Sequence, residues 1–216
     1  MMKFDKFLIV CMNEAKISFF ILLVVVSVIT CIHPIYPNDQ YLQHIGTLFL
    51  MIPLVVDLKI NRMPQGAFVG LVLFTLFHVI GARYIYSYVP YREWLVSIGM
   101  FGSDFFQDSR NNYDRFVHFA FGVLLFPYIL YLCKSVFHQK PLTAMLMTWL
   151  IIQTGSMIYE LFEWALTVFM SPDDADSYNG QQGDIWDAQK DMALAMLGST
   201  IVVVVYFFDY KLRRKA

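Results

Sequence analysis

Three acidic side chains stand directly before the last apolar stretch of the chain. The segment 179–191, NGQQGDIWDAQKD, contains Asp184, Asp187 and Asp191, which are spaced three and then four residues apart. On a helix, this spacing places all three carboxylates on one face. Carboxylates at the edge of a membrane span are costly unless they are paired, bind a metal or face a water-filled cavity. The spacing therefore predicts that other segments supply partners for them.

Two other strings carry ionisable residues at the edges of apolar stretches. The string YDRFVHF places Asp114 four residues before His118, with Arg115 beside the acid, so the carboxylate and the imidazole share a helix face. The string YELFEW places Glu160 and Glu163 three residues apart, as neighbours on a helix. Carboxylate oxygens and imidazole nitrogens bind divalent cations, and facing helices of a bundle can supply them to one ion. The pattern predicts a carboxylate-rich site shared by three spans.

These residue types favour a metal-dependent hydrolase or transferase that acts on a lipid or lipid-linked headgroup. A divalent metal would lower the pKa of a bound water and polarise a phosphoryl or acyl group, while a carboxylate serves as general base. Arg115 would hold an anionic headgroup, because guanidinium matches phosphate oxygens. The other catalytic assignments are Asp114 and Glu163, the latter as a base or a supporting residue. The expected metal ligands are His118, Glu160, Asp184, Asp187 and Asp191.

The same residues also have explanations without chemistry. Ion pairs between Asp114 and Arg115, or between Arg115 and Glu160, would let helix ends sit at the membrane interface. Acids in the first turn of a helix complement its dipole, which accounts for Asp184 and Asp187. The helix dipole does not account for Glu160 and Glu163, which lie well inside a span, so a functional site is favoured for the cluster as a whole.

Two further polar features favour structural roles. His78, near the end of the third apolar stretch, is expected to be a buried histidine with satisfied hydrogen bonds rather than a ligand. The acidic run Asp173, Asp174 and Asp176 is expected to be a solvated loop.

The composition indicates one polytopic membrane domain covering residues 1–216. The chain is 58% hydrophobic and 15% charged, with a mean hydropathy of +0.54, which is too apolar for an ordinary soluble domain. The expected partner is the lipid bilayer, and no nucleic-acid partner is expected. Six apolar stretches predict an all-α bundle of six transmembrane helices, with flanking Lys, Trp and Tyr completing the shorter ones. They cover residues 17–32, 41–56, 67–82, 116–133, 142–170 and 192–208.

Lysine and arginine residues collect on one side of such a bundle. They precede the first stretch, join the second to the third and the fourth to the fifth, and follow the sixth. Because short cytoplasmic loops are enriched in these residues, both termini are predicted to be cytoplasmic. The acidic site then lies on the extracytoplasmic side.

Four strings together carry a family resemblance: HVIGARYIYSYVPYREW, DRFVHFAFG, YELFEWA and GDIWDAQKDMALAMLG. Through them, most of the chain resembles the bacterial inner-membrane family typified by YjdF. The resemblance implies a multi-pass protein of the bacterial inner membrane, and it implies no reaction, since the activity of that family is uncharacterised. A fainter similarity is to VanZ-like membrane proteins, in which an acid, a basic residue and a histidine open one span. Asp191 stands where that pattern has an asparagine.

Two other classes of function are alternatives. A cation- or proton-coupled transporter would use the same carboxylates to bind a cation or relay protons. It should also have polar residues that continue toward the cytoplasmic side, where the deeper candidates are Gln153, Thr154, Ser199 and Thr200. That path is thin, which favours a one-sided site. A membrane scaffold would carry its function in the outer loops and tolerate loss of the acids. The sequence has no nucleotide-binding loop, nucleophile elbow or paired-cysteine site, which removes several enzyme classes.

Overall fold

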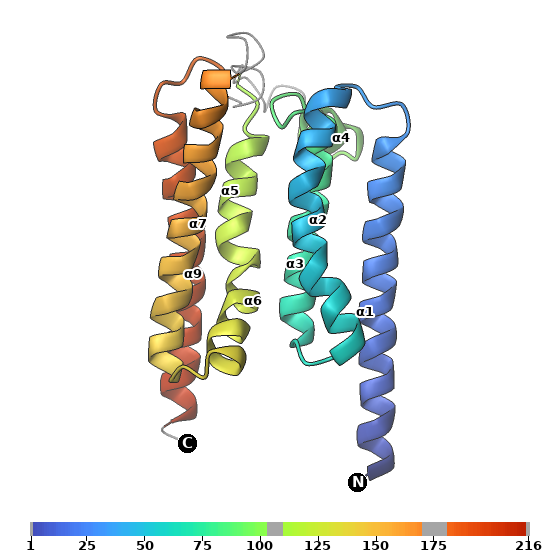
Figure 1. The fold of residues 1–216 in the computed structure, drawn as a ribbon, viewed down its shortest axis with the longest axis vertical. Coiled ribbons are helices and arrows are strands. Elements are labelled where there is room, and N and C mark those ends of the chain that lie inside the picture. The colour runs from blue at the N-terminus through green and yellow to red at the C-terminus, as the bar shows by residue number, and fades with distance from the viewer. Residues whose placement is uncertain (1, 103–109, 170–180, 215–216) are drawn as a thin grey trace.

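The chain folds into a bundle of long helices that run roughly parallel or antiparallel to one another (Figure 1). The computed structural model describes residues 2–102, 110–169 and 181–214, and within these ranges it contains no strand. The helices are α1 (Met2–Cys31), α2 (Pro37–Ile60), α3 (Gln65–Arg83), α4 (Tyr91–Ser97), α5 (Tyr113–Leu124), α6 (Phe126–Tyr131), the π-helical turn η2 (Leu132–Val136), α7 (Pro141–Phe169) and α9 (Asp187–Arg213).

The prediction of an all-α protein with six spans is confirmed, because six helical segments are long and apolar enough to cross a bilayer. Most helices extend beyond the predicted apolar stretches; α2 covers Pro37–Ile60, where 41–56 was expected. The extension has a simple cause, since flanking polar residues continue the backbone hydrogen bonds of a helix as well as apolar ones do. Met170, the predicted end of the fifth stretch, and the acidic run Asp173, Asp174 and Asp176 lie outside the described residues.

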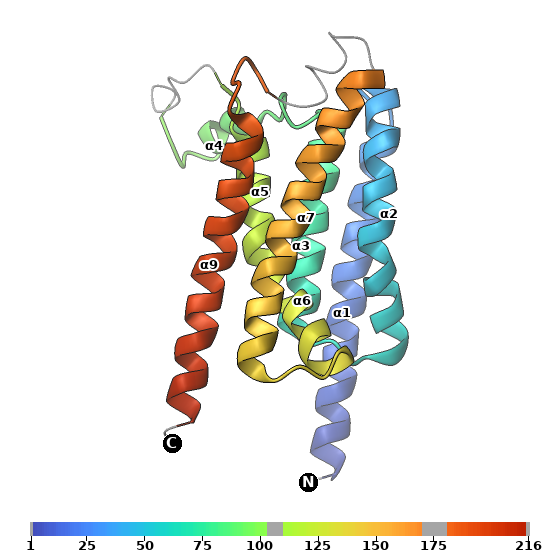
Figure 2. The ribbon, with the colours of Figure 1, turned by 60° about the vertical axis from the view of Figure 1, so that its left-hand side comes forward.

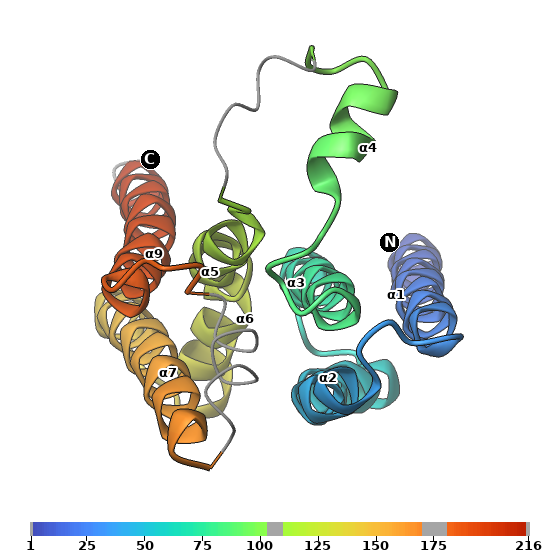
Figure 3. The ribbon, with the colours of Figure 1, turned by 90° about the horizontal axis from the view of Figure 1, so that it is seen from above.

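The helices form two groups that meet along a seam. In the first group α1 and α2 pack against α3, and in the second α9 packs against α5 and α7 (Figure 3). The groups contact each other mainly where α3 lies against α5 and α6. Both chain termini lie at the same end of the bundle (Figures 1 and 2), as an even number of spans requires. That this end is cytoplasmic stays a prediction, and we call the opposite end the site end.

The fourth span is a helix interrupted at Leu125. Helix α5 ends at Leu124, and α6 begins at Phe126, directly before Pro127. Proline has no N–H to donate and its ring clashes with the carbonyl four residues earlier, which breaks the helix. Beyond the interruption, α6 packs against α3 and α7.

Two glycines let the backbones of α5 and α9 approach closely. A Cβ atom on Gly122 would lie 2.2 Å from the carbonyl oxygen of Ala195, and one on Gly198 would lie 2.5 Å from that of Phe119. Both distances are far below van der Waals contact, so only glycine fits at either position without moving a helix. The close approach places the first turns of α5 and α9 side by side at the site end.

We expect Gly122→Val to destabilise the protein by about 1–3 kcal/mol or more, because the added carbons meet rigid backbone rather than a side chain that can move. Thermal unfolding of the purified protein in detergent measures the loss. Gly66→Val is the matched control, since a Cβ atom there meets nothing within 4 Å. Equal melting of the two variants would contradict the close α5–α9 contact.

Candidate metal centre

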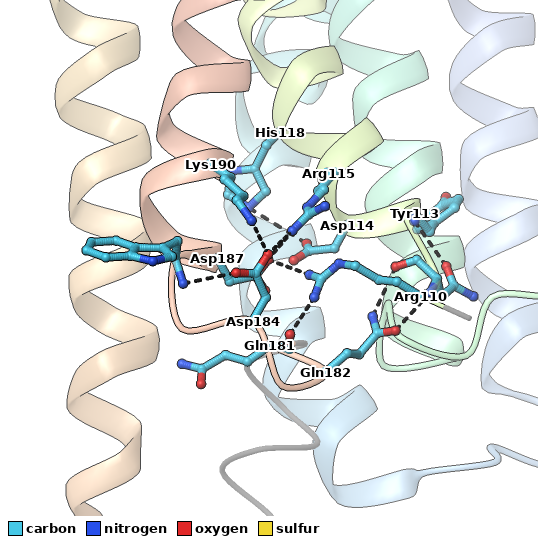
Figure 4. A network of polar contacts seen from close by, with 12 residues as sticks. Arg110, Tyr113, Asp114, Arg115, His118, Gln181, Gln182, Asp184, Asp187 and Lys190 are labelled. Atoms are coloured by element: carbon cyan, nitrogen blue, oxygen red, sulfur yellow. Dashed lines mark hydrogen bonds and ion pairs between the residues drawn. The ribbon is translucent and has the colours of Figure 1, made fainter. Parts of the chain in front are cut away.

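The predicted site residues come together at the site end, where Figure 4 shows Asp114, Arg115, His118, Asp184 and Asp187. Helix α5 supplies Asp114, Arg115 and His118 from its first two turns. Helix α7 supplies Glu160 and Glu163 near its end, and α9 supplies Asp187 and Asp191 from its beginning. Segments far apart in the sequence therefore share one cluster.

Three of these residues form a compact set of possible metal ligands. One ligand atom from each of Asp114, His118 and Asp191 lies within 4.8 Å of the others, and all three side chains are buried. His118 Nε2 is 3.7 Å from Asp114 Oδ1, as expected for residues four apart on a helix. A cation bound at about 2.4 Å from two opposite oxygens would hold those oxygens about 4.8 Å apart. The spacing of the three groups therefore suits one divalent ion.

The two glutamates of α7 complete the buried part of the cluster. Glu160 Oε1 lies 3.3 Å from His118 Nε2, and Glu163 is buried one turn further along α7. Within the described ranges, neither Glu160 Oε1 nor Asp191 Oδ1 has a hydrogen-bond partner of good geometry. Buried carboxylate oxygens without a partner are costly and call for a bound ion or water.

Asp184 and Asp187 lie in a different environment, at the rim of the cluster (Figure 4). Arg115 binds Asp184 and lies 3.3 Å from Asp187 Oδ1, while Arg110 also binds Asp187. Lys190 donates to Asp184 Oδ2 at 2.5 Å. The hydrogen bonds from Lys190, from the Trp186 backbone N–H and from Arg115 lower the pKa of Asp184 to about 2. Asp184 is therefore a charged, paired carboxylate at neutral pH.

The position of Asp184 differs from the expectation that it shares a helix face with the other two aspartates. Helix α9 begins at Asp187, and Asp184 lies in the preceding turn. Gly183, with a φ of +80°, adopts the left-handed conformation that favours glycine, and it turns the chain just before Asp184. The single-face prediction is wrong for Asp184, because a turn replaces the first helical turn.

The charges of the cluster do not balance. Six carboxylates face three lysine or arginine side chains, and all three of these cations bind Asp184 or Asp187. In the described part of the chain, only His118 lies within ion-pair distance of any of the other four, which are Asp114, Glu160, Glu163 and Asp191. Uncompensated carboxylates are expensive at membrane depth, so these four require protons or a bound cation.

Two ion pairs considered from the sequence are wrong, because Arg115 binds Asp184 and Asp187 rather than Asp114 or Glu160. Sequence reasoning also missed Arg110, which binds Asp187 and the backbone carbonyl of Gln181. The sequence does place this basic residue four positions before Asp114, but only the fold shows that it binds Asp187, which lies 77 positions away.

His78 is a structural histidine, as expected. Its Nδ1 lies 2.5 Å from the hydroxyl of Tyr86, and its Nε2 lies 3.0 Å from the backbone carbonyl of Gln43. Both ring nitrogens therefore have partners within the protein, and we exclude His78 from the candidate ligands.

Two cavities adjoin the cluster from different sides. One, of about 330 Å³, is lined by Asp114 and His118 together with side chains of α2, α3 and α7, and we call it the apolar cavity. The other, of about 260 Å³, lies between α7 and α9, and we call it the acidic pocket because it is lined by Glu160, Glu163 and Asp187. The buried carboxylates thus have access to two separate spaces.

Comparisons with known proteins agree with a membrane protein. The sequence model of a family described as "Predicted membrane protein (DUF2238)" matches residues 15–211. The inner membrane protein YjdF of Escherichia coli (strain K12) is 32% identical over 146 residues, which make up 63% of this chain and 63% of that relative. The matched region therefore spans less than two thirds of the relative. No solved structure matches the chain.

Proposed function

The chain belongs to the DUF2238 family of predicted membrane proteins, and we propose that it is a metal-dependent hydrolase or transferase acting on a lipid or lipid-linked headgroup. One observation carries the proposal: Asp114, His118 and Asp191 are buried and hold their ligand atoms within 4.8 Å of one another, and no lysine or arginine of the described residues forms an ion pair with either carboxylate. Because a relative is an inner membrane protein, we place this chain in the bacterial inner membrane. Lysine and arginine residues near both termini favour a cytoplasmic position for that end of the bundle, which supports an extracytoplasmic position for the site at the opposite end.

The donor set suits a divalent cation. Two carboxylates and one imidazole combine ligands preferred by Mg²⁺ and Mn²⁺ with a ligand preferred by Zn²⁺. Glu160, 3.3 Å from His118, is the nearest further carboxylate and would complete the set. Asp184 and Asp187 remain at the rim, since their ion pairs argue for a supporting role. When bound, the cation would supply Lewis acidity and an activated water.

The surrounding residues would bind and orient the substrate and move protons. Glu163, buried beside Glu160 in the wall of the acidic pocket, is the proposed proton acceptor. Arg115 is the proposed headgroup anchor; its side chain is partly exposed at the rim, and its buried Nε donates no hydrogen bond to any of the described residues. A headgroup held there would lie between the rim cations and the buried carboxylates.

The packing deeper in the bundle supports a one-sided site rather than a transport path. Gln153 Nε2 donates to Ser199 Oγ at 2.9 Å, and Trp149 Nε1 donates to Thr200 Oγ1 at 3.0 Å. Gln153 and Trp149 of α7 therefore bind Ser199 and Thr200 of α9 across the helix contact. A relay of protons or cations would need these groups to be free to rearrange. The burial of the carboxylates likewise argues against a scaffold whose function resides in its outer loops.

An assay of lipid turnover tests the proposed function. The purified protein is placed in bilayer discs containing phosphatidylethanolamine, phosphatidylglycerol and a polyprenyl diphosphate, with Mn²⁺, Zn²⁺ or Mg²⁺ supplied in turn. Mass spectrometry follows the loss of each intact lipid and the release of its headgroup. We expect one lipid class to be consumed with a metal present and preserved when a chelator is added. Consumption of no lipid with any of the three ions, or consumption that a chelator leaves unchanged, would contradict the proposal.

A further inference from the structure

The apolar cavity reaches from the candidate metal centre toward the middle of the bundle. Asp114 and His118 form its polar end. From Asp114 to Phe121, both of which line the cavity, α5 advances by seven residues, or roughly 10 Å. Along this distance much of the wall is apolar, and it includes Leu50, Phe74, Val117 and Phe121. The cavity is therefore polar at the site end and apolar further along the bundle.

The cavity opens sideways, between α2 and α7. These two helices make few contacts with each other, because the two helix groups meet mainly where α3 lies against α5 and α6 (Figure 3). Phe49 of α2 lines the cavity and yet is 68% exposed, which marks the mouth. Since α2 and α7 are membrane spans, this mouth faces the hydrocarbon of the bilayer rather than water.

The position and the lining of the cavity select its occupant. The mouth lies between two membrane spans, and the wall beyond the polar end is built from side chains such as Leu50, Phe74 and Phe121, so the occupant is an apolar group that comes from the bilayer. A single hydrocarbon chain is narrow enough, and the apolar walls suit it. His78 adds no free polar group, because both its nitrogens bind within the protein. The charged or titratable groups at the polar end are Asp114 and His118, and the buried hydroxyl of Ser156 is a further polar group in the wall.

We propose that the apolar cavity holds one hydrocarbon chain of the substrate lipid, which enters sideways from the bilayer between α2 and α7. The inference rests on the proposed function and narrows it, because it requires a substrate with a flexible apolar chain rather than a water-soluble phosphate ester. With the chain in the cavity, the headgroup lies at the level of the buried carboxylates. The hydrocarbon chain of the substrate thus stays in an apolar environment and its headgroup in a polar one, as in the bilayer.

A cavity-filling substitution tests the occupant. The probe is phosphatidylglycerol with a photoreactive diazirine in one acyl chain, incorporated in bilayer discs with the protein. We expect the wild-type protein to be labelled on cavity residues such as Val117. Leu50→Trp should lower that labelling about tenfold, because the larger side chain would displace about two methylene groups of the lipid from the cavity, and each buried methylene group contributes about 0.8 kcal/mol to binding. The matched control is Leu48→Trp on the same helix, because Leu48 is 65% exposed and does not line the cavity.

A second variant and a second readout separate the possible failures. Gly155→Leu fills the cavity from α7, where a Cβ atom meets only the movable tip of Phe121, and it should lower the labelling as Leu50→Trp does. Labelling equal to that of Leu48→Trp in both cavity variants would overturn the inference, whatever metal the protein binds. Mn²⁺ binding is measured on the same samples. If Leu50→Trp lowers the labelling but the wild-type protein binds no Mn²⁺, the result would support the chain-binding cavity and contradict only the metal centre.

Discussion

Asp191→Asn is expected to abolish metal-dependent turnover while leaving the helical bundle folded. Asp191 is only 2% exposed, and its Oδ1 has no hydrogen-bond partner in the described part of the chain. Asparagine keeps the shape of the side chain and removes the charge that a cation would bind. We expect a loss of at least about 100-fold, because changing residues that merely support a metal ligand already costs about 10–100-fold. Steady-state turnover of the lipid class that wild type consumes in the bilayer-disc assay measures the loss.

The melting temperature of Asp191→Asn separates a functional site from a structural network. Without metal, the variant should melt no lower than wild type, because the substitution removes an unpaired buried charge. Unfolding of the variant would indicate that the carboxylate instead holds the bundle together. Asp209→Asn is the control, since Asp209 forms an exposed ion pair with Arg213 at the opposite end and should keep full activity.

The second large effect is expected at a buried ion pair near the terminal end, far from the candidate site. The Lys16 side chain is 1% exposed, and its Nζ lies 2.6 Å from Asp57 Oδ2, 2.9 Å from Asn61 Oδ1 and 2.7 Å from the carbonyl oxygen of Met63. The other oxygen of Asp57 accepts hydrogen bonds from the backbone N–H groups of Arg62 and Met63. All three donors of the ammonium group are used, so this network is structural. It ties α1 to the turn between α2 and α3.

Asp57→Leu should lower the free energy of unfolding by about 3–5 kcal/mol, because it leaves the Lys16 ammonium buried without its carboxylate. It also leaves two backbone N–H groups without acceptors, so it should cost more than Lys16→Met. Thermal or denaturant unfolding in detergent measures the order of the variants. Lys59→Met is the control, since Lys59 is exposed and forms no ion pair among the described residues. Unfolding of Asp57→Leu no earlier than Lys59→Met would show that the ion pair contributes nothing.

The helices could be predicted from the sequence because each apolar stretch is long enough to demand a helix in a membrane, even where Pro53 lies within α2. The pairing of Asp114 with His118 could also be predicted, since it depends only on the period of one helix.

The addition of Asp191 to that pair depends on tertiary packing. It follows from the close approach of α5 and α9 at Gly122 and Gly198, and no local spacing encodes that approach. The same holds for Arg110, whose ion pair with Asp187 joins residues 77 positions apart. The apolar cavity likewise arises from loose packing between α2 and α7, which becomes visible only when the two helix groups are assembled.

Metal stoichiometry tests the central claim most directly. Wild type, Asp191→Asn and Asp184→Asn are brought to equilibrium by dialysis against the same free concentration of Mn²⁺, Zn²⁺ or Mg²⁺, and the metal per chain is counted by mass spectrometry. Asp184 serves as the comparison because it is held by Lys190 and Arg115 rather than by the buried cluster. We predict one ion per chain in wild type and in Asp184→Asn, and none in Asp191→Asn. No bound ion in wild type, or the same count in all three proteins, would contradict a metal centre at Asp114, His118 and Asp191.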